Sequence, residues 1–61
     1  MVKVFIVVMD YSTPCVWFTS HEFKKGWQIE DIENWLVEEH GYCDSTSYYM
    51  ASEEPITIEQ R

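Results

Sequence analysis

The feature that most constrains this chain is a largely apolar segment near its start, VKVFIVVM at residues 2–9, whose last six residues are all apolar. The run is rich in β-branched and aromatic side chains, which favour strands over helices. Apolar residues occupy both sets of alternating positions, so both sides of a strand would be apolar. Strands that are buried on both faces have this pattern. We therefore predict a central strand at residues 2–9.

Three further segments of the sequence are predicted to form strands. Turn-forming residues at 11–14, preceded by Asp10, separate the first strand from CVWFT at residues 15–19. These two strands make the simplest hairpin. SYYMA at residues 47–51 predicts a third strand. Residues 55–58 predict a short fourth or edge strand, because proline is tolerated at the start of a strand.

One main helix is predicted at residues 28–40, and Gly41 is expected to end it. At 100° per residue, the apolar side chains fill one continuous arc of this helix, which consists of Ile29, Ile32, Trp35 and Leu36. A shorter helical turn is predicted before it, at residues 19–25. Thr19 and Glu22 have the spacing of a capping box there, and Gly26 would stop the turn.

These elements predict a single small α+β domain over residues 1–61, with the order ββαβ or ββαββ. The expected sheet is mainly antiparallel, with three or four strands in the order 2-1-3. A right-handed crossover would then place the helix on one sheet face. The other face has no predicted cover, and an uncovered aromatic face usually marks an interaction surface.

The charge of the chain is strongly asymmetric. The net charge is -7, and nine acidic residues but no lysine or arginine lie between Lys25 and Arg61. This imbalance repels nucleic acid and anionic lipid and attracts basic surfaces. RNA-binding aromatic sheets also need a positively charged groove, so direct nucleic-acid binding is excluded. No run approaches 18 apolar residues, and the first is too short for a signal peptide, so we expect a cytoplasmic protein and no membrane partner.

The acids of the predicted helix differ in how easily they are explained. Glu30 and Asp31 lie in the first turn, where carboxylates complement the helix dipole. Glu38 and Glu39 lie in the last turn, where each costs about 0.3–1 kcal/mol and no lysine at i±4 compensates them. One interpretation is that these acids form a solvated, charged helix face that has no binding role. The functional interpretation is a protein-binding surface for a basic partner, with Trp35 as its anchor.

The two cysteines and two histidines supply the donor atoms of a zinc site, but not its spacing. Cys15 and His21 form C-x5-H, and His40 and Cys43 form H-x2-C after an interval of eighteen residues. Neither matches the usual paired arrangement of zinc ligands. A nucleophilic Cys43 is also disfavoured, because the helix C-terminus beside it is expected to raise its pKa. We therefore predict no cofactor, no metal and no enzymatic activity, and free cysteines.

Two functional hypotheses remain. The first is a small acidic protein-binding module, an inhibitor or adaptor that docks on a basic surface; such proteins are common among phage and mobile-element accessory proteins. The second is a structural homodimer that pairs its sheet faces or strand edges. A partial nucleic-acid mimic is a third alternative, although the acid density is lower than the phosphate density of duplex DNA.

Overall fold

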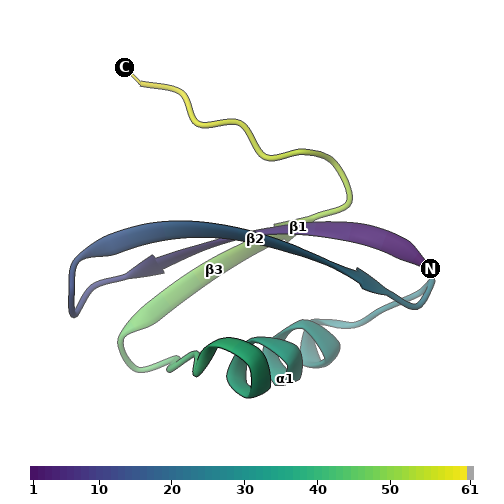
Figure 1. The fold of residues 1–61 in the computed structure, drawn as a ribbon, viewed down its shortest axis with the longest axis horizontal. Coiled ribbons are helices and arrows are strands. Elements are labelled where there is room, and N and C mark those ends of the chain that lie inside the picture. The colour runs from purple at the N-terminus through teal and green to yellow at the C-terminus, as the bar shows by residue number, and fades with distance from the viewer. Residues whose placement is uncertain (61) are drawn as a thin grey trace.

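The structure, a computed structural model, describes residues 1–60 of the chain. The elements follow in the order β1 (Val2–Asp10), β2 (Cys15–Phe23), α1 (Ile29–His40) and β3 (Ser47–Ser52). The three strands form one sheet in the order β2-β1-β3, and β1 is antiparallel to both neighbours. Figure 1 shows α1 packed on one face of this sheet. The predicted α+β fold, the strand order and the single-sided helix are confirmed.

The first hairpin has a turn that its sequence explains. The Asp10 carboxylate accepts hydrogen bonds from the Ser12 amide at 2.9 Å and from the Ser12 hydroxyl at 2.7 Å. Asp and Ser commonly stabilise turns in this way. The hydrogen bonds also lower the pKa of the Asp10 carboxyl, the Ser12 hydroxyl being the largest cause. The turn thus fixes the register of β1 against β2 from one end.

β2 is four residues longer than expected, and the helical turn predicted at residues 19–25 is wrong. Residues 19–23 continue the strand, where Thr19 pairs with Ile6 and Phe23 pairs with Val2. The first half of β1 offers these residues a full set of backbone partners, which a single helical turn cannot match. Phe23 also becomes buried, with 8% of its surface exposed.

α1 has the ends that the sequence predicts. The Asp31 carboxylate accepts a hydrogen bond from the Gln28 amide at 2.8 Å, which caps the first turn. Gly41 ends the helix in the left-handed conformation, with φ at +64°. Of the predicted apolar arc, Ile32 and Leu36 are fully buried, whereas Ile29 is 55% exposed. Angular position alone placed Ile29 in the arc, but it is the first helical residue and lies outside the core cluster.

The buried core lies between α1 and the sheet. Among residues 1–60, its hydrophobic members are Val4, Ile6, Val8, Phe23, Ile32 and Leu36. Alternate residues of β1 therefore face the helix, and the register places the alternate residues of β2 and β3 beside them. Half-buried aromatic side chains surround this core, which are Trp17, Trp27, Trp35, Tyr42 and Tyr49.

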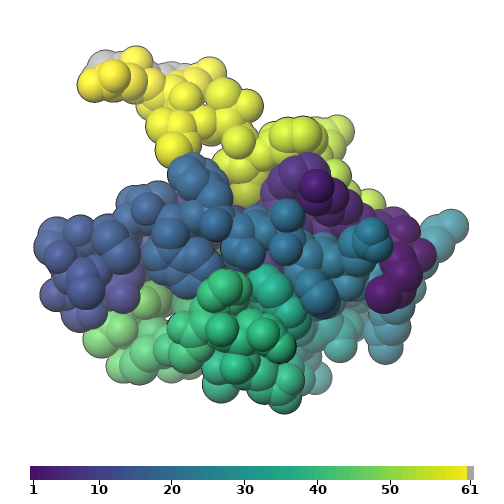
Figure 2. All heavy atoms as spheres, viewed as in Figure 1, coloured from purple at the N-terminus to yellow at the C-terminus, as the bar shows by residue number. Residues whose placement is uncertain are grey.

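The fourth strand predicted at residues 55–58 is not formed. The chain bends after β3, where the Ser52 hydroxyl accepts a hydrogen bond from the Glu54 amide at 3.0 Å. Pro55 then has no amide proton to offer a sheet edge. We call residues 53–60 the C-terminal arm. It leaves the sheet on the side opposite α1 and projects from the body of the molecule (Figures 1 and 2).

Candidate functional site

The five residues predicted to bind a partner do not all meet at one place. Glu30, Glu38 and Glu39 are exposed on α1, and Asp31 and Trp35 are half-buried. Asp31, Trp35 and Glu38 line a common groove between α1 and the end of β2. Glu30 and Glu39 are not among the residues that line it. The structure thus brings together three of the five, one turn apart along the helix.

The groove has a volume of about 370 Å³. That size falls at the lower end of the range for sites that bind small groups or side chains. We call it the acidic groove, and it is lined by Met1, Glu22, Phe23, Lys24, Asp31, Asn34, Trp35 and Glu38.

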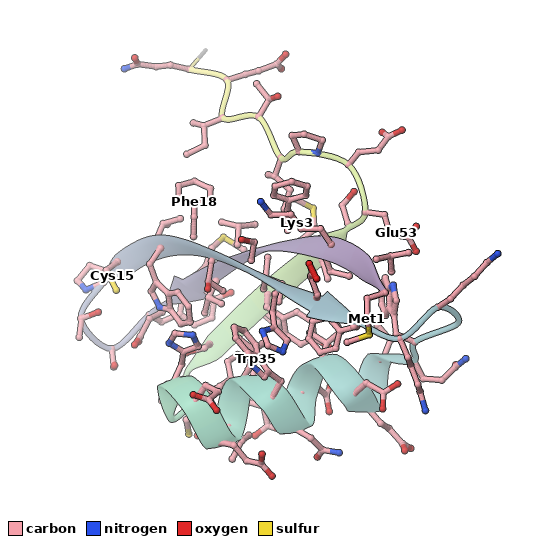
Figure 3. All side chains as sticks on the ribbon, turned by 45° about the vertical axis from the view of Figure 1, so that its right-hand side comes forward. Met1, Lys3, Cys15, Phe18, Trp35 and Glu53 are labelled. Atoms are coloured by element: carbon pink, nitrogen blue, oxygen red, sulfur yellow. The ribbon has the colours of Figure 1, made fainter. Side chains whose placement is uncertain are left out.

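The floor of the acidic groove is aromatic and held in place from several directions. The His21 ring stacks on Trp35 at 4.6 Å between centroids and 20° between planes. Phe23 meets Trp35 edge-on at 5.9 Å, and His40 does so at 5.0 Å from the C-terminal end of α1. The Trp17 ring lies 4.9 Å from the His40 ring, between centroids. Figure 3 shows Trp35 between the helix and the sheet. Such contacts fix the indole, and a fixed aromatic ring makes a good binding anchor.

The rim of the acidic groove carries more negative than positive side chains. Asp31 and Glu38 contribute carboxylates from α1, and Lys24 contributes the one basic side chain that lines it. Asp31 already caps α1, so its oxygen atoms are partly occupied. Glu38 is exposed on α1, whereas the pairing of Glu22 with Lys3 places the Glu22 side chain on the opposite face of the sheet. A cationic side chain could therefore lie on the aromatic floor with its charge beside the Glu38 carboxylate.

Other acidic residues take part in the internal hydrogen bonding of the fold. Glu33 accepts a hydrogen bond from the Tyr49 hydroxyl at 3.3 Å, and Glu53 accepts one from the Trp27 indole at 3.1 Å. Burial, and then the negative charge of Glu33, raises the pKa of Tyr49 to about 12. These two acids join separate elements of the chain, so part of the acidic half is structural.

The four residues considered as zinc ligands are divided between different places. Cys15 and Cys43 are free and exposed. His21 and His40 both contact Trp35 through their rings. Within residues 1–60, no group of three or more histidine, cysteine, aspartate or glutamate side chains is placed to hold a metal ion.

A second hollow, of about 290 Å³, lies beside Cys43 and is lined by Glu33, Val37, Tyr42, Cys43 and Asp44. The sequence led us to expect a raised pKa for the Cys43 thiol, and this was wrong. The Ser45 hydroxyl lies 3.0 Å from Cys43 Sγ and lowers the pKa of the thiol, because it stabilises the thiolate by a hydrogen bond. His40 packs against the rings of Trp17 and Trp35.

Sequence reasoning missed five of the eight residues that line the acidic groove, and two of these five, Glu22 and Phe23, belong to β2. Both were assigned to a helical turn that does not form. The signal that could have found them is the alternation of Trp17, Thr19, His21 and Phe23, which continues the strand period of two. Once β2 runs to Phe23, its end lies beside the helix and completes the groove.

Comparison of the chain with protein-family models, with curated proteins and with solved structures gave no match. Among residues 1–60, no helix has the length and apolar character needed to cross a membrane.

Proposed function

We propose that this protein is a small, non-enzymatic binding module that docks on a basic protein surface through the acidic groove. The observation that carries the proposal is the combination in one groove of a fixed aromatic floor and an acidic rim. Trp35 and Phe23 provide the floor, and Glu38 provides an exposed carboxylate beside it. Lysine and arginine side chains have apolar stems and charged ends, so they match both parts.

The overall charge supports the same proposal. A net charge of -7 steers a basic partner towards the molecule, and the groove then provides a defined place for one of its side chains. The remaining acids of α1, Glu30 and Glu39, would add long-range attraction rather than direct contacts. We take the cytoplasm as the place of action, as the sequence suggests, and an inhibitor or adaptor as the role.

A peptide titration tests the proposal. The probe is a peptide of about 12 residues rich in lysine and arginine, because its binding should follow the salt dependence of charged partners. Binding is followed by the indole and amide signals in NMR spectra, which report separately on Trp35 and on the other tryptophans. We expect the Trp35 indole and the Phe23 amide to shift most, and binding to weaken as salt is raised.

A matched pair of variants separates the groove from net charge. Glu38→Lys and Glu54→Lys change the net charge by the same amount, but Glu54 lies in the C-terminal arm, outside the groove. We expect Glu38→Lys to weaken binding by about tenfold or more, as like charges do when placed at an interface, and Glu54→Lys to have a much smaller effect. Equal losses in both variants would contradict the proposal, since the probe would then respond to charge alone.

A further inference from the structure

The face of the sheet opposite α1 is apolar and largely uncovered. We call it the open face. The registers of β1 with β2 and of β1 with β3 place its apolar side chains in two adjacent rows across the sheet. One row contains Val16, Met9 and Tyr48, and the next contains Phe18, Val7 and Met50. Between 44% and 62% of the surface of Met9, Val16, Phe18, Tyr48 and Met50 is exposed. In Figure 3, Phe18 points away from the helix side, where Trp35 lies.

The composition of β1 is typical of a strand whose open face is also covered by another layer. Its residues are apolar on both sides, as in strands that are covered on both sides. α1 covers one side, with Val4, Ile6 and Val8 at 1% exposure or less. The alternate residues Phe5 and Val7 are only half-buried, and Met9 is exposed. A contiguous exposed patch of this kind marks a site of association.

The charge pattern favours a second copy of this chain over a basic partner on the open face. Within β1, β2 and β3, its charged residues are Lys3 and Glu22, which are direct cross-strand neighbours of opposite sign. The face therefore carries no net charge from its strands, although the molecule carries -7. The strands therefore present no net negative charge on this face that a basic partner could recognise. Two copies that meet here keep the acidic helices on opposite outer sides, where their repulsion is weakest.

The open face alone is smaller than the surface that each partner usually contributes to a stable dimer. Strands of up to nine residues, about 30 Å long and about 4.8 Å apart, give a three-stranded face of only about 400 Å² in projection. A standard interface takes about 800 Å² from each partner. The C-terminal arm can supply the difference, because its eight residues extend to about 27 Å. Ile58 in this arm is 65% exposed, and Ile56 is half-buried.

The arm is also placed for this role. It leaves β3 on the open-face side and stands away from the body (Figures 1 and 2). Ile56 and Ile58 alternate with Thr57 and Glu59, so an extended arm presents one apolar side. We propose that two copies of this chain associate through their open faces about a two-fold axis, with the C-terminal arm of each lying across the sheet of the other.

Sedimentation equilibrium on the full chain tests this association, with a matched pair of substitutions. Val16 and Val37 are the same residue type with 54% and 53% exposure, but Val16 lies on the open face and Val37 on α1. We expect the wild type to form dimers at about 200 μM, within the range of small interfaces, and Val16→Asp to raise the dissociation constant by at least about tenfold. Val37→Asp should leave it unchanged. Both sites are exposed, so neither variant should unfold the monomer, and circular dichroism checks this.

The arm has its own matched pair, Ile58→Asp and Ile29→Asp, because both isoleucines are exposed and only Ile58 lies in the arm. We expect Ile58→Asp to weaken the dimer several-fold and Ile29→Asp to leave it intact. Isotope-filtered NMR on a mixture of labelled and unlabelled chains should show contacts between the Ile58 methyl groups and the Phe18 ring of the other copy.

Three results would overturn the proposal. Even a small interface associates at about 200 μM. A wild-type chain that stays monomeric at this concentration would show that the open face does not bind a second copy. Equal weakening by Val16→Asp and Val37→Asp would place the contact elsewhere. An absence of contacts between chains at Ile58 would remove the exchanged arms. None of these results bears on the acidic groove, which lies on the helix side of the sheet.

Discussion

The two faces of the sheet share a single central strand but differ in what covers them. On the helix side, Val4, Ile6 and Val8 are buried to 1% exposure or less. On the open face, the intervening residues Phe5 and Val7 remain half-buried. The side chains are of the same apolar kind on both faces. The difference teaches that composition makes a face suitable for burial, and only a second layer makes it a core.

The largest effect is expected where the helix layer itself is broken. Leu36 is fully buried, and its neighbour Val37 is 53% exposed. Leu36→Ala should lower the free energy of unfolding by about 3 kcal/mol, because it leaves a cavity, and Val37→Ala should change it by less than about 0.5 kcal/mol. Urea unfolding of both variants checks this. Comparable losses would mean that the helix layer does not distinguish the two positions.

The next comparison uses neighbouring valines of β1 that point to opposite faces. Val8 has 1% exposure on the helix side, whereas Val7 is half-buried on the open face. In dilute protein, Val8→Ala should cost about 2 kcal/mol of unfolding free energy, and Val7→Ala less than about 1 kcal/mol. If two copies cover the open face, the cost of Val7→Ala should rise with protein concentration. A cost that does not change with concentration would mean that the face stays open.

A smaller effect is expected at the C-terminal end of α1, the helix that covers one face of the sheet. Gly41 has φ at +64°, and a Cβ built there meets no atom within 4 Å. Gly41→Ala should therefore introduce backbone strain but no steric clash. We expect it to lower the free energy of unfolding by about 1 kcal/mol. Thermal unfolding followed by circular dichroism measures it. A stabilised variant would contradict the left-handed helix end.

The smallest effect near neutral pH concerns Tyr49, which lies on the covered face. Its pKa is raised to about 12, so the folded state favours the neutral phenol. The corresponding stability is fully present below about pH 10, the pKa of an unfolded tyrosine, and is lost as the pH rises towards 12. Tyr49→Phe should remove this alkaline loss. The measurement is the free energy of unfolding at about pH 9 and pH 11.5, on either side of the unfolded pKa.

The matched control is Tyr48→Phe, which removes a phenol from the open face instead. The difference between the two variants isolates the contribution of Tyr49. An alkaline loss that persists in Tyr49→Phe would show that another group is responsible.

The sequence contains enough information for the elements whose signals are local. β1 follows from its apolar alternation, and α1 from its periodicity and from Gly41. The strand order follows because β1 is the most apolar strand and belongs in the centre. The open face was also expected, because one helix of about 13 residues covers only one side of a small sheet. These features depend on neighbouring residues or on simple geometry.

Features that depend on distant residues could not be obtained in the same way. The extension of β2 to Phe23 depends on backbone partners in β1, and these outweigh the local capping pattern at Thr19. The acidic groove follows from that extension, so Glu22 and Phe23 were missed. Glu33 is a surface residue by sequence, but Tyr49 from β3 makes it a hydrogen-bond acceptor. The exposure of Ile29 depends on how far the core extends along the helix axis.

The position of β1 in the sheet has a consequence for how this chain folds. β1 comes first in the sequence and pairs both with β2, which follows it directly, and with β3, which comes last. The hairpin can close quickly because its loop is short, whereas the pairing of Val8 with Tyr49 must close a loop of about 40 residues. Such distant pairings slow folding. We therefore expect the hairpin to form early, and the helix and β3 to join it in the rate-limiting step.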